Sequence, residues 1–164
     1  DYSLLLDGLM AEREQGITVI PPFDDKEIIC GQATMALEIV EDLPKVDTVL
    51  VPLSGGGLIS GVTLGMKMTL PDVKIVGISQ ERAAVMIESL KVGHPIEMPE
   101  EPTLADSLLG GIGLDNRYTF EITRDYVDEV AQVSEEQIAE MKAFCEEKRK
   151  YFDMMYKIAD DVTK

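Results

Sequence analysis

The sequence has no tryptophan, one histidine and two cysteines, and these scarcities exclude several kinds of site. The single histidine, His94 beside Pro95, leaves no histidine-rich metal centre and no convincing Ser-His-Asp triad, and we interpret it as a turn residue. Cys30 and Cys145 lie far apart and outside any metal-ligand spacing. We therefore expect both to be reduced thiols that are buried or half-buried.

Basic residues are also scarce. The chain carries 15 lysines and arginines against 31 acidic residues, a net charge of −16, and such a surface repels a nucleic-acid backbone. No long uncharged apolar run predicts a membrane span, and the N-terminal residues 2–10 lack the basic start of a signal peptide. We expect a cytoplasmic protein with no nucleic-acid partner and no membrane partner.

The most informative stretch is a run of glycines between two apolar segments. Residues 48–53 (TVLVPL) predict a buried strand and residues 59–68 an apolar helix. Between them stands the glycine loop, which consists of Ser54, Gly55, Gly56, Gly57 and Leu58. Glycines let backbone N–H groups turn toward one point, and the first helical turn adds unpaired donors and a positive dipole end. The loop predicts a phosphate cradle, although a tight strand-to-helix turn that needs small residues gives the same pattern.

The glycine spacing narrows the choice of phosphate ligand. No Lys-Ser or Lys-Thr pair follows the glycines, which excludes a Walker-type loop. The spacing of Gly55, Gly57 and Gly61 only approximates the dinucleotide fingerprint. Two alternatives stay open: a dinucleotide-binding oxidoreductase domain in which Glu81 binds a ribose, and a non-catalytic remnant whose loop binds phosphate or nothing.

Strand and helix patterns alternate along the chain. Strands are predicted at residues 17–20, 48–53, 74–78 and 127–133, and helices at 4–16, 26–41, 59–68, 83–92, 117–126 and from Ser134 onward. Ser134 and Gln137 form a capping box. The alternation predicts an α/β fold with a parallel sheet covered on both faces and a ligand outside the carboxyl ends of the strands. About four strands are fewer than a complete doubly wound sheet has, so we expect an incomplete sheet.

Several motifs share one order and spacing. They are residues 21–25 (PPFDD), 31–34 (GQAT), 51–58 (VPLSGGGL), 103–107 (TLADS) and 127–138 (VDEVAQVSEEQI). This string resembles the threonine dehydratase and serine racemase group of fold-type II pyridoxal-phosphate enzymes, from about residue 2 to residue 150. Residues 77–84 and 104–120 look most like the hydroxyectoine-utilisation dehydratases within that group.

The resemblance implies a fold and a reaction. The fold would be the Rossmann-like large domain of a tryptophan synthase β-like enzyme, formed by residues 1–150 and followed by a divergent helical tail at residues 151–164. The cofactor would be pyridoxal 5′-phosphate, its phosphate held by Ser54, Gly55, Gly56, Gly57 and the N–H of Leu58. The reaction would be β-elimination from a hydroxy amino acid such as threonine or serine, giving a 2-oxo acid and ammonia. We also expect a homo-oligomer, specifically a dimer, because an exposed half-sheet seeks a partner.

Some family features are absent from the chain. The family's Schiff-base lysine lies in a Ser-x-Lys-x-Arg-Gly segment, which does not occur here, so we assign no catalytic residue and expect no turnover by this chain alone. Ser79 and Val85 stand where metal-stimulated members have acidic ligands, so we assign no metal ligand. Glu81 is interpreted as a surface acid near a helix start.

Two smaller groups are also candidates. Asp24 and Asp25 form a carboxylate pair, which we interpret as shaping a turn and capping the next helix. Gln32 and Thr34 lie on that helix, and the resemblance implies that Gly31 and Gln32 pack near the cofactor region. Ordinary packing of the helix accounts for the same residues equally well.

Overall fold

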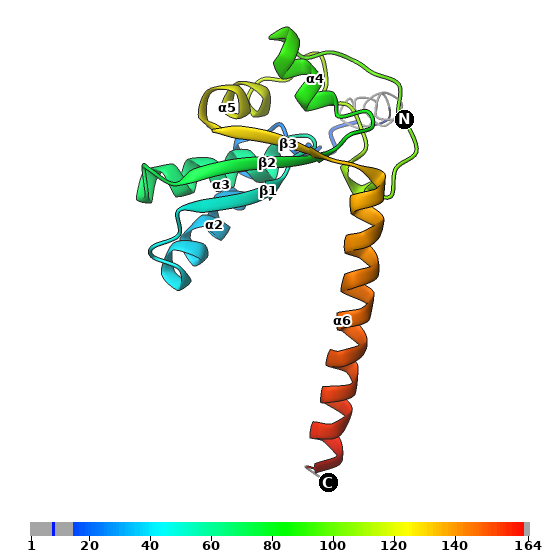
Figure 1. The fold of residues 1–164 in the computed structure, drawn as a ribbon. Coiled ribbons are helices and arrows are strands. Elements are labelled where there is room, and N and C mark those ends of the chain that lie inside the picture. The colour runs from blue at the N-terminus through cyan, green and yellow to red at the C-terminus, as the bar shows by residue number, and fades with distance from the viewer. Residues whose placement is uncertain (1–7, 9–14, 163–164) are drawn as a thin grey trace.

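The structure is a computed structural model that describes residue 8 and residues 15–162 of the chain. Its elements follow the order α2 (Lys26–Asp42), β1 (Thr48–Pro52), α3 (Gly57–Thr69), β2 (Lys74–Gln80), α4 (Val85–Val92), η1 (Asp106–Leu108), α5 (Thr119–Tyr126), β3 (Glu129–Val133) and α6 (Glu135–Val162). The helix predicted at residues 4–16 lies almost wholly outside the described residues. The alternation of strand and helix confirms the α/β prediction (Figure 1).

The three strands form one parallel sheet in the order β1-β2-β3. The central strand β2 is buried over most of its length, in keeping with its β-branched residues, and β3 lies at an edge of the described sheet. The register pairs Pro52 with Ile78 and Gln80 with Val133, so the carboxyl ends of all three strands meet at one edge. The glycine loop leaves β1 at this edge.

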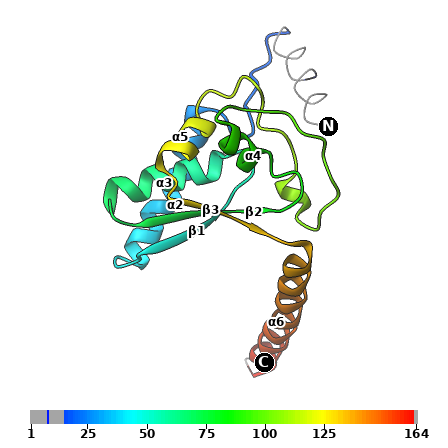
Figure 2. The same cartoon turned by 45° about the horizontal axis from the view of Figure 1, so that its top comes forward.

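Helices α2, α3 and α5 lie on one face of the sheet, whereas α6 projects away from the sheet (Figures 1 and 2). α2 packs on α3, and α3 also contacts α5. Crossovers between parallel strands are right-handed as a rule, so successive crossovers in the order 1-2-3 place their helices on the same side. On the other face, Leu50 of β1 is 66% exposed. The prediction that both faces are covered is therefore wrong for the described part of the chain.

The tight contact between α2 and α3 depends on residues without bulky side chains. A Cβ at Gly61 would lie 2.6 Å from Cβ of Gln32, and one at Gly65 would lie 2.6 Å from Cβ of Ala36. Gln32 thus lies in the helix–helix contact, which supports the packing interpretation of this residue. α2 is only partly buried, and Leu37 is 62% exposed.

Residues 17–20 do not form the predicted strand. Ile17 and Ile20 are 51% and 71% exposed, and the segment is irregular. Pro21 and Pro22 lack the N–H groups that would extend a ladder, and no described strand lies alongside to pair with the segment. The described sheet therefore has three strands rather than about four.

Helix α6 begins as its capping box predicts. The Gln137 N–H donates to Ser134 Oγ at 3.2 Å, and the Ser134 N–H donates to Gln137 Oε1 at 2.9 Å. The helix then runs unbroken to Val162 and projects away from the sheet (Figure 1). Within the described residues, no helix is long and apolar enough to span a membrane.

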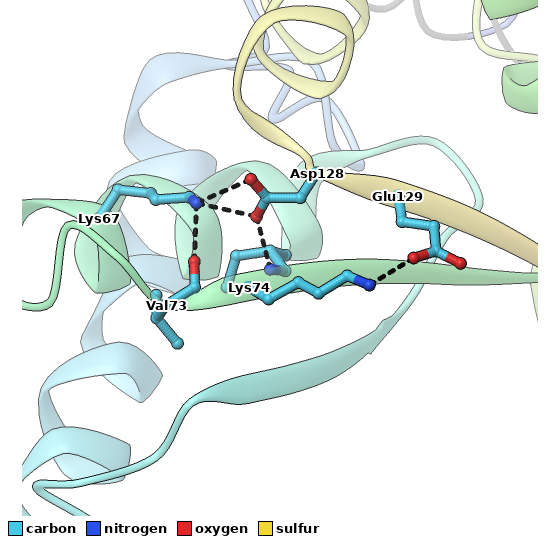
Figure 3. A network of polar contacts seen from close by, with 6 residues as sticks. Lys67, Val73, Lys74, Asp128 and Glu129 are labelled. Atoms are coloured by element: carbon cyan, nitrogen blue, oxygen red, sulfur yellow. Dashed lines mark hydrogen bonds and ion pairs between the residues drawn. The ribbon is translucent and has the colours of Figure 1, made fainter.

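A polar contact fixes α3 to the start of β2 and β3 (Figure 3). Lys67 Nζ donates to both carboxylate oxygens of Asp128 and to the carbonyl of Val73 at 2.7 Å. The Ile75 N–H donates to Asp128 Oδ2 at 2.7 Å. The hydrogen bonds from Lys67 and Ile75 hold the pKa of the Asp128 carboxyl below its ordinary value of 3.8.

Candidate phosphate-binding site

The glycine loop forms the start of α3. Gly56 is the N-cap residue with φ of 90°, a left-handed conformation that glycine adopts without strain, and no side chain caps it. The first intrahelical bond runs from the Ser60 N–H to the Gly56 carbonyl at 2.9 Å. The N–H groups of Gly57, Leu58 and Ile59 therefore have no acceptor within the helix, and they are available to a ligand.

The electrostatic surroundings of the loop suit an anion. The first turn of α3 contains no acidic residue, in contrast to α2, whose N-cap Asp25 accepts from the Glu27 N–H at 2.8 Å. Free backbone donors and the positive end of the helix dipole both attract a phosphate group. The loop thus fits the phosphate of the expected cofactor by its donor chemistry.

The loop is held from two sides. The ring of Phe23 lies against Gly55, and the Phe23 backbone lies so close to Gly57 that a Cβ there would be 2.9 Å from Phe23 Cα. A Cβ on Gly56 would be 2.8 Å from Cβ of Thr119 and 2.9 Å from Cε of Met86. These contacts show that the absence of Cβ atoms serves close packing as well as backbone geometry.

Ser54 belongs to a polar network at the carboxyl ends of β1 and β2. Its hydroxyl donates to the Leu108 carbonyl at 2.9 Å, and Nε2 of Gln80 donates to the same carbonyl at 3.4 Å. The Ser79 hydroxyl donates to Oε1 of Gln80 at 3.1 Å. Ser79 and Gln80 are 2% and 1% exposed, so this part of the network is buried beside the loop, whereas Ser54 and Leu108 are half-buried.

The Leu108 carbonyl belongs to a long connection between α4 and α5, residues 94–118, which we call the strap. Glu135, at the start of α6, fixes the strap by accepting from the Thr103 hydroxyl and, at 2.8 Å, from the Leu104 N–H. The hydrogen bond from Thr103, followed by that from Leu104, lowers the pKa of Glu135 below its ordinary value of 4.5. Arg82 donates to the Pro102 carbonyl at 2.9 Å.

Asp24 and Asp25 both cap helices. Asp25 caps α2, as predicted. Asp24 accepts from the N–H groups of Arg117, Tyr118 and Thr119 at 2.6, 2.9 and 2.9 Å, at the start of α5. The contact of Asp24 joins residues far apart in sequence. With it, α5 starts at Thr119 and not at the predicted residue 117.

The remaining sequence candidates lie outside the loop. Glu81 is exposed and accepts from the Glu135 N–H at 3.3 Å, which confirms the interpretation as an acid near a helix start. Cys30 and Cys145 are free thiols, but both are exposed, so the expectation of burial was wrong. His94 is exposed. Among the described residues, no three His, Cys, Asp or Glu side chains are placed to hold a metal ion.

Sequence reasoning missed the network of Gln80. Residues 79 and 80 extend β2 beyond its predicted end, and two consecutive polar residues at a strand end normally indicate exposure. The only available signal was their position at the carboxyl end of the central strand, beside the glycine loop.

A parallel sheet with an uncapped, glycine-rich helix start at its carboxyl edge defines an α/β domain that binds a phosphorylated cofactor. Comparison with known families identifies the family of this domain and its cofactor. The family model described as "Pyridoxal-phosphate dependent enzyme" matches residues 6–152, and the chain belongs to this family. The cofactor of the family is pyridoxal 5′-phosphate, as the motif string implied.

Individual relatives indicate which members of the family the chain is similar to. The chain is 42% identical to an L-threonine ammonia-lyase of Thermotoga maritima over 87% of this chain and 35% of the relative. It is 36% identical to a serine racemase of Oryza sativa over 83% of this chain and 39% of the relative. Maize serine racemase has a similar structure, with a TM-score of 0.75 and 37% identity over 82% of this chain and 40% of that chain. The chain thus spans well under half the length of these relatives.

Proposed function

We propose that the protein carrying this chain catalyses β-elimination from a small hydroxy amino acid, threonine or serine, with release of a 2-oxo acid and ammonia. In this proposal the chain supplies the phosphate site of pyridoxal 5′-phosphate, formed by Ser54, Gly55, Gly56, Gly57 and the N–H of Leu58. The observation that carries the proposal is the uncapped start of α3 at the carboxyl edge of the sheet. Relatives named threonine ammonia-lyase and serine racemase support the reaction.

The residues of this chain bind and orient. The backbone N–H groups of Gly57 and Leu58 donate to phosphate oxygens, and Phe23 and Thr119 keep the loop in the conformation that aims these donors. When bound, the cofactor would supply an electron sink for the electron pair left at Cα after proton removal, so that the β-hydroxyl could leave. The loop would anchor the phosphate end of the cofactor at the carboxyl edge of the sheet.

The reaction is tested with the full-length protein loaded with pyridoxal 5′-phosphate. We expect L-threonine to give 2-oxobutanoate, L-serine to give pyruvate, and each to give ammonia in equal amount. A loaded protein that forms neither 2-oxo acid contradicts the proposed reaction. Chiral analysis of the remaining serine in the same assay detects racemisation, and racemisation without elimination would make the protein a racemase instead.

The rival ligand is tested by thermal unfolding of the same protein without cofactor. Pyridoxal 5′-phosphate is expected to raise the melting temperature, because a ligand that binds only the folded state stabilises it. NAD is expected to have no effect. A rise with NAD alone would favour the dinucleotide-binding alternative, and no rise with either would favour the non-catalytic remnant.

Four finer expectations belong to the proposal. The division of the chain at residue 150, the dimeric state and the cytoplasmic location remain predictions. Hydroxyectoine utilisation also remains a prediction, carried only by the residues 77–84 and 104–120. Activity with the amino acid released from hydroxyectoine breakdown, compared with threonine, tests the last of these.

A further inference from the structure

The Leu108 carbonyl has two donors, and one of them is part of the proposed phosphate site. A serine hydroxyl has one hydrogen to donate, and Ser54 gives it to Leu108 at 2.9 Å. While this hydrogen bond exists, Ser54 cannot donate to a phosphate oxygen. If Ser54 turns toward phosphate, the Leu108 carbonyl loses its closer donor.

Gln80 is the second donor to that carbonyl. A carbonyl only accepts, so the nitrogen of the Gln80 amide must face Leu108, and its distance of 3.4 Å leaves room for a shorter hydrogen bond. The amide oxygen accepts from the Ser79 hydroxyl at 3.1 Å, which agrees with the orientation that the Leu108 carbonyl imposes. With 1% exposure, Gln80 has no water to replace these partners.

The strap holds the carbonyl in place independently of Ser54. The Leu108 N–H donates to the Ala105 carbonyl at 2.9 Å, and the Ala105 N–H donates to the Thr103 hydroxyl at 3.1 Å. Thr103 in turn donates to Glu135. The Leu108 carbonyl therefore stays beside Gln80 when Ser54 moves.

We propose that Gln80 is a positioning residue for the cofactor phosphate. When the Ser54 hydroxyl turns from Leu108 to a phosphate oxygen, Gln80 Nε2 becomes the sole protein donor to the half-buried Leu108 carbonyl. A carbonyl partly shielded from water loses stabilising free energy when its donor leaves, so without Gln80 the phosphate bond of Ser54 would be made at the expense of that carbonyl. This inference rests on the proposed phosphate site.

The test is a double-mutant cycle on the cofactor-free full-length protein, with Ser54→Ala and Gln80→Met. Dissociation constants are measured by calorimetry for pyridoxal 5′-phosphate and for pyridoxal, which lacks the phosphate. Gln80→Met is expected to weaken binding of pyridoxal 5′-phosphate about tenfold, the effect of one hydrogen bond of about 1.4 kcal/mol, and to leave pyridoxal binding unchanged. In the Ser54→Ala background, Gln80→Met is expected to cause no further loss of affinity for pyridoxal 5′-phosphate. Without the Ser54 hydroxyl, the hydrogen-bond partners of the Leu108 carbonyl are the same before and after the cofactor binds.

Two outcomes overturn the proposal. Equal weakening of both ligands by Gln80→Met means that the residue has a merely structural role. If the affinity loss of the double variant equals the product of the losses of the two single variants, Gln80 does not act through Ser54. Failure of the phosphate site itself looks different, since the unmutated protein would then bind pyridoxal as tightly as pyridoxal 5′-phosphate.

Ser79→Ala is the matched control. It removes a buried hydroxyl of the same network but leaves the donor to Leu108, so we expect an unchanged ratio of the two dissociation constants.

A second measurement needs no folded Gln80 variant. In protein labelled with nitrogen-15 glutamine, the side-chain amide proton of Gln80 is expected to shift downfield on addition of pyridoxal 5′-phosphate, and to stay in place in Ser54→Ala. The same shift in both proteins would contradict the exchange of donors.

Discussion

At the scale of single residues, the conformation of Gly56 and the contacts of Asp24 decide the geometry of the site. The sequence pointed to the glycine loop because three consecutive glycines between a strand pattern and an apolar helix are typical of a phosphate-binding turn. It gave no sign that Asp24 would reach residues 117–119, because a capping contact between distant segments leaves no local pattern. The role of Gln80 was hidden for the same reason.

Gly56 and Gly93 form a natural pair for a substitution test. Their φ angles are 90° and 86°, so an alanine at either position costs about 1 kcal/mol of strain. Only Gly56 lies in the loop, and only there would the new Cβ meet Thr119 and Met86, whereas nothing lies within 4 Å of a Cβ at Gly93. We expect Gly56→Ala to weaken binding of pyridoxal 5′-phosphate at least tenfold and to lower stability by more than Gly93→Ala does.

Calorimetric titration and urea unfolding of the two variants check this prediction. Gly93→Ala is expected to bind the cofactor normally despite its strain. If the two variants bind equally well, the loop does not hold the phosphate.

Asp24 offers a test of the contact between the PPFDD motif and α5. Its carboxylate accepts from three backbone N–H groups, whereas that of Asp25 accepts from one. We expect Asp24→Ala to lower the free energy of unfolding by about 2–3 kcal/mol and Asp25→Ala by about 1 kcal/mol. Urea unfolding of both variants measures the difference, and equal losses would show that the long-range contact adds nothing.

At the scale of elements, the helices and central strand were predictable because their apolar periodicity is strong and their caps are local. The ends of elements were less predictable, because they depend on backbone details that leave no pattern in the sequence. α4 begins at Val85 rather than residue 83 because Ala83 has φ of 48°. β3 begins at Glu129 rather than residue 127 because Val127 is still the C-cap of α5, and its N–H donates to the Thr123 carbonyl at 3.3 Å. The strand prediction at residues 17–20 failed because an apolar run without a pairing partner does not form a strand.

The contact of Asp128 with Lys67 predicts a pH dependence. Because the folded-state pKa of Asp128 lies below 3.8, folding favours the carboxylate, and its contribution is fully present above about pH 4 and is lost as the pH falls through the folded pKa. We expect Asp128→Asn to be less stable than the unmutated protein by about 1 kcal/mol at pH 7, since the ion pair is partly screened by solvent.

The difference in the free energy of unfolding between Asp128→Asn and the unmutated protein is expected to shrink below pH 4. Urea unfolding across the pH range measures this difference. Glu129→Gln is the matched control, because it removes the neighbouring exposed ion pair with Lys74 without removing a backbone hydrogen bond. A difference for Asp128→Asn that is independent of pH would show that the charge of Asp128 does not stabilise the fold.

At the scale of the whole molecule, the described sheet has one face without helices and an edge strand, β1, with an exposed leucine. Leu50 is 66% exposed on β1, whereas a leucine in a parallel sheet is normally covered. We expect this face to be covered in the full-length protein, either by other parts of the same chain or by a second copy. The sequence predicted an incomplete sheet from the small number of strands, but it did not indicate which face was open.

Leu50→Lys tests whether the face is covered. In the full-length protein we expect Leu50→Lys to lower the free energy of unfolding by about 2 kcal/mol or more. A covered lysine would lose its hydration, and it would not make the apolar contacts of the leucine. Met68→Lys, at a position that is 86% exposed at the end of α3, is the control and is expected to be nearly neutral. Light scattering of both variants shows whether the cover is a second copy, since only then would Leu50→Lys dissociate an oligomer. A neutral Leu50→Lys would mean that the face is open to solvent.

The central claim is that the glycine loop binds the phosphate of pyridoxal 5′-phosphate, and a crystal structure of the full-length protein with this cofactor tests it most directly. We expect phosphate oxygens within hydrogen-bonding distance of the N–H groups of Gly57 and Leu58, with the Ser54 hydroxyl turned from Leu108 toward the phosphate. A cofactor whose phosphate is bound elsewhere, with the N–H groups of α3 left to solvent or to another ligand, would contradict it.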